Sequence, residues 1–107
     1  MKKFYIWLDD ERPMLGFQSE LLYNQIMFHA HNYQECIDAI VEAQKQKYEI
    51  WIHFDNDLGE EKEGYDVAKY IVENQIPIKY RIHTMNPVAR KNIDGLLSHY
   101  GYEQFQW

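Results

Sequence analysis

The chain has 107 residues, of which 46% are hydrophobic and 16% aromatic, which is enough for one domain, residues 1–107, with a single core. Its net charge of −6 argues against non-specific DNA binding and against attachment to an anionic membrane. The single cysteine, Cys36, excludes an internal disulfide and a zinc site built from cysteines. The apolar run near residue 4 is too short for a signal peptide, so we expect a cytoplasmic protein.

Short apolar runs predict the strands of a sheet. Residues 4–8 and 50–54 are continuously apolar, which is typical of strands buried on both faces. Residues 26–31 and 78–84 alternate between apolar and polar side chains, as outer strands do. Residues 103–107 alternate again and indicate a short fifth strand at an edge.

Helical patterns separate the later strands. Asn32 is a suitable amino-terminal cap for the first helix, the second is expected to start near Gly64, and Asn86 caps a third that Gly101 ends. Between the first two strands only residues 19–23 could be helical, so the first crossover helix is short or missing. Strands alternating with helices predict an α/β domain with a parallel sheet covered on both faces, in the flavodoxin-like order 2-1-3-4 with the fifth strand outside.

Polar side chains follow three of the predicted strands. In an open α/β sheet the ligand crevice lies outside the carboxyl ends of the strands, so these side chains are expected to meet there. Neighbouring carboxylates repel unless a cation neutralises them, and oxygen ligands suit Mg²⁺ or Mn²⁺. The sequence therefore predicts an acidic, metal-binding crevice formed by three clusters: Asp9, Asp10, Glu11 and Arg12; Asp55, Asn56 and Asp57; and His83, Thr84 and Asn86.

Three ordered motifs span most of the chain. They are Leu8-Asp9-Asp10-Glu11-Arg12-Pro13, then Phe54-Asp55-Asn56-Asp57-Leu58-Gly59 with Gly64-Tyr65-Asp66-Val67, and finally Ile82-His83-Thr84-Met85-Asn86-Pro87-Val88. Over residues 4–97 the chain resembles the cyclic-phosphate processing receiver-like domains, relatives of the response-regulator receiver fold found in bacteria and their phages. The resemblance implies a receiver-like three-layer sandwich.

The resemblance also implies roles for individual residues. In receivers, an acidic pair after the first strand holds Mg²⁺ and an aspartate at the end of the third strand accepts a phosphoryl group. Asp9 and Asp10 match the pair and Asp55 matches the acceptor, and in this chain all three would hold the metal. Thr84 matches the receiver hydroxyl that ends the fourth strand. No lysine matches the receiver lysine of the fifth strand, so a developing phosphoryl charge would lack its usual cation, which counts against phosphorelay signalling.

The resemblance to the receiver-like family instead implies a site built around an arginine in the first motif and a histidine in the third. Arg12 and His83 hold these two positions here. Arg12 would hold the charge of a cyclic phosphodiester, and His83 would deliver or remove a proton beside the metal on Asp55. Asp57 would orient His83 or complete the metal shell. Asn56 stands where the family more often has histidine, which leaves open whether the chain catalyses a reaction or only binds.

Substrate contacts are also expected from four side chains: Arg12, Asp57, Thr84 and Asn86. The helix that follows Asn86 would add its first backbone amides, which point at any anion in the crevice. Simpler roles remain open for each. Arg12 could pair with its acidic neighbours, His83 could bond a strand-end backbone group, and Asn86 could be only the helix cap.

Three functions therefore remain open. The first is a metal-assisted phosphoesterase, or a binder, acting on cyclic phosphates of nucleotides or RNA ends. The second is an interaction module without enzymatic activity that binds a protein partner, as in conflicts between phages and bacteria. The third is a receiver phosphorylated on Asp55. We rank them in this order.

Overall fold

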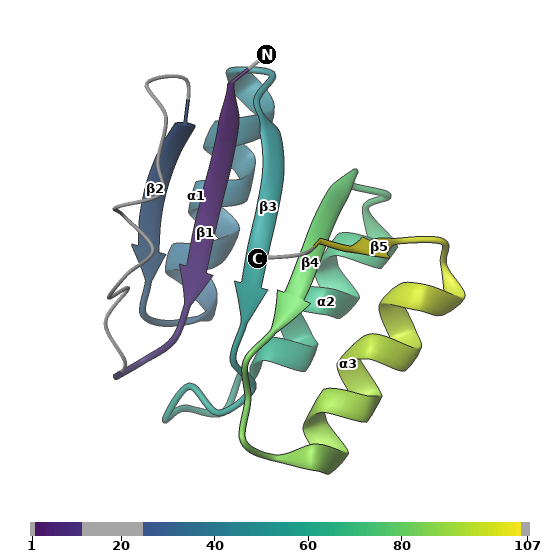
Figure 1. The fold of residues 1–107 in the computed structure, drawn as a ribbon. Helices are drawn as coiled ribbons and strands as arrows, with labels where there is room; N and C mark the ends of the chain where they lie inside the picture. The colour runs from purple at the N-terminus through teal and green to yellow at the C-terminus, as the bar shows by residue number, and fades with distance from the viewer. Residues whose placement is uncertain (1, 12–24, 106–107) are drawn as a thin grey trace.

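The computed structural model describes residues 2–11 and 25–105, and Figure 1 shows how their helices and strands are arranged. The sheet of the described residues has five parallel strands in the order β2-β1-β3-β4-β5. The strands are β1 (Lys3–Leu8), β2 (Gln25–Ala30), β3 (Glu49–Phe54), β4 (Ile78–Ile82) and β5 (Glu103–Gln104). The helices are α1 (Tyr33–Lys45), α2 (Gly64–Glu73) and α3 (Pro87–His99). The flavodoxin-like, receiver-like α/β fold and the short fifth strand are confirmed.

Helices α1, α2 and α3 all cover the same face of the sheet, and Figure 1 shows α1 and α2 behind the strands. The connections β2 to β3, β3 to β4 and β4 to β5 all run toward the same edge, so right-handed crossovers place their helices on one side. Only the connection from β1 to β2 runs the other way. The predicted third layer and the short helix at 19–23 fall in that connection, and residues 12–24 lie outside the described ranges.

The register of the strands sorts side chains onto the two faces. Ile6 of β1 pairs with Ile52 of β3, which pairs with Tyr80 of β4, and all three are fully buried under the helices. The apolar core therefore lies between the sheet and α1, α2 and α3. This burial supplies most of the driving force that holds the strand ends in place.

The opposite face of the sheet is rich in aromatic rings. Trp51 contacts Tyr5 with ring centroids 5.5 Å apart and Phe105 at 4.8 Å. Trp7 lies beside His53 at 5.0 Å. This aromatic layer extends to the carboxyl ends of β1 and β3, where Trp7 also contacts His83.

Side-chain caps fix the beginnings of the helices where the sequence predicts them. The Asn32 side chain accepts the amide of Glu35, and the Asn86 side chain accepts the amides of Val88 and Ala89. Strand β4 ends at Ile82, two residues before the predicted limit, because the chain already turns toward the cap of α3 there.

Helices α1 and α2 are each followed, two residues beyond their last residue, by a residue with a left-handed backbone that is not glycine. Lys47 has a φ of 59° and Gln75 has a φ of 53°. In each case the following amide bonds a carbonyl of the last helical turn, Tyr48 to Ala43 at 2.9 Å and Ile76 to Ile71 at 3.0 Å. These bonds close both helices at the amino edge of the sheet.

Candidate functional site

The three polar loops meet at one crevice of about 430 Å³ outside the carboxyl ends of β1, β3 and β4. Five of the nine residues that line it are acidic, and no lysine or arginine is found among the described residues of its wall. The crevice therefore carries a strong negative potential that favours cations. Its lining residues are Asp9, Asp10, Glu11, Asp55, Asp57, Gly59, Thr84, Met85 and Asn86.

Three side chains in this region lie close enough to share one metal ion. Each of Asp9, Asp55 and His83 offers a ligand atom, and these atoms all lie within 4.8 Å of one another. Asp9 is 1% exposed and Asp55 is 7% exposed. Two buried carboxylates this close to each other need a cation or hydrogen-bond donors to offset their charge.

The sheet itself fixes the backbone of all three residues. The amide of Asp9 donates to Ala30 O at 3.0 Å, that of Asp55 to Leu8 O at 2.9 Å, and that of His83 to Phe54 O at 2.8 Å. Each bond continues the strand ladder by one step beyond the strand end. The spacing of the three side chains is therefore set by a rigid element rather than by loops.

His83 is oriented by contacts on two sides. Its ring stacks on Trp7 with centroids 4.3 Å apart and planes 7° from parallel, and its Nε2 lies 3.0 Å from Asp9 Oδ2. The predicted partner Asp57 is exposed, and its Oδ1 accepts the amide of Gly59 at 3.2 Å. The carboxylate that orients the imidazole is therefore Asp9 rather than Asp57.

Asp10 lines the crevice outside the group of three. A Cβ added at Gly59, whose φ is 67°, would lie 3.0 Å from Asp10 Oδ2. The glycine thus permits the close approach of the loop after β3 to this carboxylate. Of the predicted metal ligands, the structure groups Asp9 and Asp55 with His83, and it places Asp10 beside the neighbouring loop.

The side chain of Asn56 is bonded to the loop before α2 and to the start of that helix. Its amide nitrogen donates to the Glu63 carboxylate at 3.0 Å, and its Oδ1 accepts the Tyr65 amide at 3.2 Å. A different surface hollow, shared with Asn86 and Asn92, receives this side chain. The side chain at position 56 is therefore part of the loop before α2 and not of the donor set at the strand ends.

Thr84 and Asn86 shape the opposite wall. Thr84 Oγ1 accepts the amide of Asn86 at 3.2 Å, and the Asn86 side chain is engaged as the cap of α3. Arg90, a residue that the sequence motifs did not mark, donates to Ile82 O at 3.0 Å and to Thr84 O at 3.1 Å. No pattern in the sequence singles it out, because its partners are backbone carbonyls at the end of β4 and in the loop that follows.

His53 is a second histidine that the sequence did not place near the site. It is 4% exposed between Trp7 and Phe105, whose ring centroids both lie 5.0 Å away. Burial, and after it the positive charges of His83 and Arg81, lower the pKa of His53 to about 3. His53 is therefore neutral at physiological pH and serves as packing beneath His83.

Arg12, predicted to hold the substrate phosphate, lies outside the described residues. Its role stays a prediction from the sequence.

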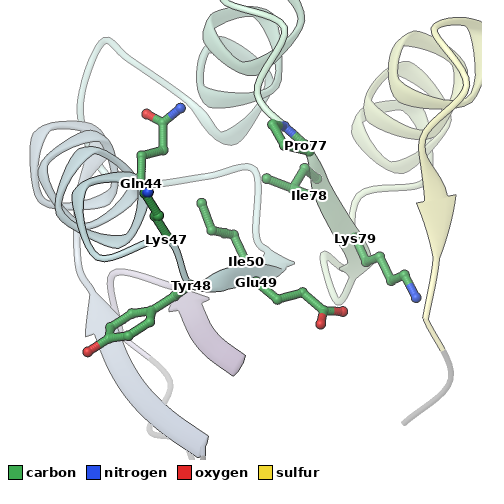
Figure 2. Close-up of a pocket in the computed structure, with 8 residues that line it drawn as sticks. All are labelled: Gln44, Lys47, Tyr48, Glu49, Ile50, Pro77, Ile78 and Lys79. Carbon is green, nitrogen blue, oxygen red and sulfur yellow. The ribbon is translucent and has the colours of Figure 1, made fainter. Parts of the chain in front are cut away.

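A cavity of about 500 Å³ lies at the opposite, amino edge of the sheet (Figure 2). Apolar residues Ile50, Ile78 and Pro77 line it together with Tyr48 and with the polar or charged residues Gln44, Lys47, Glu49 and Lys79. The charged residues Glu49 and Lys79 of its rim interact with Trp51, through a 2.9 Å hydrogen bond from the indole and a contact 5.1 Å from the ring centroid. Most of the surface exposed inside this cavity is nevertheless apolar.

An open parallel sheet with an acidic crevice beyond β1 and β3 defines a receiver-like α/β domain. The family model described as cyclic-phosphate processing receiver domain matches residues 4–99, and the chain therefore belongs to that family. The comparison with curated proteins gives no match. Within the described ranges, no helix has the length and apolar character needed to cross a membrane.

Proposed function

We propose that this domain binds a cyclic phosphate ester of a nucleotide or RNA end in the acidic crevice and processes it with a divalent cation. The grouping of Asp9, Asp55 and His83 at that crevice, in a chain of the cyclic-phosphate processing family, is the observation that carries the proposal. The crevice volume of about 430 Å³ lies within the range of sites for small ligands.

The charge of the crevice explains why a cation is part of the proposal. A phosphodiester anion beside five acidic side chains is repelled, and the described wall offers no lysine or arginine to offset this. Two carboxylates and an imidazole fit a divalent cation. A cation held there would polarise a phosphoryl oxygen.

The chain's own groups would then orient the ester. Thr84 Oγ1 accepts a backbone amide, so its hydroxyl hydrogen can be donated to a phosphoryl oxygen. Arg90 holds the carbonyl of Thr84 and thereby fixes the position of this hydroxyl. The amino end of α3 adds a favourable potential for the anion from the same wall.

The test is an amide NMR titration with a 2′,3′-cyclic nucleotide, in Mg²⁺ and in Zn²⁺, with phosphorus spectra from the same sample. We expect shifts at residues 9–11, 55–59 and 83–86, and loss of these shifts in Asp55→Asn. Asp38→Asn, on the exposed side of α1, is the matched control and should bind as the unchanged protein does.

A ring-opened product in the phosphorus spectrum would identify an enzyme, and shifts without product would identify a binder. If the amides of the crevice stay unmoved with both metals, cyclic phosphate is not the ligand. Beryllofluoride labelling of Asp55 would then favour the phosphoryl-accepting receiver, and its absence a protein-binding module.

A further inference from the structure

The donor set at the strand ends contains a nitrogen ligand as well as oxygens. Asp9 and Asp55 offer carboxylate oxygens, and His83 offers Nε2, which already points at Asp9 Oδ2 from 3.0 Å. Adjacent ligand atoms around an ion with bonds of about 2.1 Å are separated by about 3 Å, so this pair of atoms already has the spacing of two ligands of one ion.

The imidazole is held in a position to act as a ligand. The stack on Trp7 fixes the plane of the His83 ring, and the 2.8 Å bond from His83 N to Phe54 O fixes its backbone. His53 also lies beside Trp7, with ring centroids 5.0 Å apart, and so adds packing around the ring on which His83 stacks. A ring fixed in this way loses little freedom when it binds a metal, which strengthens the binding.

An imidazole changes which metal the site prefers. Mg²⁺ favours oxygen ligands and keeps several waters, whereas Zn²⁺ and other first-row transition metals bind imidazole nitrogen well. Three side-chain ligands with a remaining position for water or substrate are the arrangement found in catalytic zinc sites.

We therefore propose that Asp9, Asp55 and His83 form a transition-metal site that prefers Zn²⁺ or Co²⁺ to Mg²⁺. This inference rests on the proposed function, since it names the ion that would hold the phosphate ester. It also gives His83 a new role. A histidine that binds the metal through Nε2 is a ligand and not the proton carrier that the sequence motifs imply.

The first experiment is a titration of the metal-free protein, without nucleotide, with Co²⁺ followed by its visible absorption and with Zn²⁺ and Mg²⁺ by calorimetry. We expect one ion per chain and binding of Zn²⁺ at least about tenfold tighter than that of Mg²⁺. In His83→Gln we expect Zn²⁺ binding to weaken by about a hundredfold or more, and Mg²⁺ binding to change far less.

The control variant is His99→Gln, which removes an exposed imidazole from the last turn of α3 and should bind Zn²⁺ as the unchanged protein does. An amide spectrum of each variant checks its fold. If His83→Gln fails to fold, nitrogen-15 spectra of the unchanged protein decide instead. Zn²⁺ should then move the His83 Nε2 resonance far more than that of His99.

Equal affinity for Mg²⁺ and Zn²⁺, full Zn²⁺ binding by folded His83→Gln, or a His83 Nε2 resonance that Zn²⁺ leaves in place would each overturn the inference. These outcomes are separate from the fate of the proposed function. A protein that binds cyclic nucleotide only with Mg²⁺ would keep the function and lose the transition-metal site. A protein that binds Zn²⁺ through His83 but no cyclic nucleotide would do the reverse.

Discussion

The two edges of the same sheet carry hollows of similar volume and opposite chemistry. The carboxyl edge has a crevice of about 430 Å³ in which five of nine lining residues are acidic. The amino edge has a cavity of about 500 Å³ whose lining includes the apolar residues Ile50, Ile78 and Pro77 (Figure 2). Volume therefore does not mark the candidate site in this fold. The direction of the strands does, because it brings three polar loops to one edge.

The two edges also differ in where the backbone has glycine. At the carboxyl edge, glycines stand where the chain passes close to other atoms, as at Gly59 beside Asp10 and at Gly64 beside Asp55. At the amino edge, the left-handed positions that end α1 and α2 hold Lys47 and Gln75, which bear the strain of a side chain. The carboxyl edge thus depends on glycine for close packing. A side chain added there should destabilise the fold, whereas glycine in place of Lys47 or Gln75 at the amino edge should stabilise it.

The largest expected effect comes from Gly64→Ala. A Cβ at Gly64 would lie 2.1 Å from the backbone oxygen of Asp55, so α2 must move away from the end of β3. We expect the free energy of unfolding to fall by about 3 kcal/mol, measured by urea denaturation. The matched change Gly95→Ala, in an exposed part of α3 with nothing within 4 Å, should raise it by about 0.7 kcal/mol. Equal effects at the two positions would refute this explanation.

The second effect is a pH dependence at the carboxyl edge. The pKa of His53 is about 3 in the folded protein against an ordinary value of 6.5, so below about pH 6.5 the unfolded chain takes up a proton that the folded chain does not. The free energy of unfolding should therefore decrease as the pH is lowered below about 6.5, and the loss should reach about 2 kcal/mol at about pH 5. Urea denaturation of His53→Leu at the same pH values should show a shallower fall. An unchanged pH profile would exclude His53 as the source.

The third prediction separates the two edges directly. Tyr48 lines the apolar cavity and stacks on Phe4 with ring centroids 6.1 Å apart. In Tyr48→Ala we expect a loss of about 1.5 kcal/mol in the free energy of unfolding and unchanged Zn²⁺ binding by calorimetry. Weakened Zn²⁺ binding in a folded variant would mean that the edges are coupled.

The smallest effect is a gain in stability at the amino edge. Lys47→Gly relieves the strain of a side chain at a φ of 59° and should raise the free energy of unfolding by up to about 1 kcal/mol. Gln75→Gly, at the end of α2, is the parallel case with a φ of 53°. Thermal denaturation measures both, and a loss of stability in both variants would show that the lysine and glutamine side chains stabilise these helix ends.

The fold could be predicted because its signals are local. Continuous and alternating apolar runs mark the strands, and Asn32 and Asn86 cap the helices through side chains that reach only three residues ahead. The meeting of the three polar loops follows from strand order and direction. These features do not depend on how distant side chains are rotated.

The arrangement inside the site could not be predicted in the same way. The bond between His83 and Asp9 depends on the stack of His83 on Trp7 across strands that are far apart in sequence. Asn56 lies next to Asp55 in the chain, yet its side chain bonds Glu63 rather than facing the crevice. Such details are set by packing between strands and loops, which a motif does not contain.

The contact between Asp9 and His83 joins residues that are 74 positions apart and passes over the end of β3. A chain still being synthesised holds no such contact until β4 has been made and docked, because the loop that closes it spans most of the domain. Ligand atoms assembled this late in folding bind only the native state. A metal ion at this position would therefore stabilise the whole sheet against unfolding, and its affinity would report whether folding is complete.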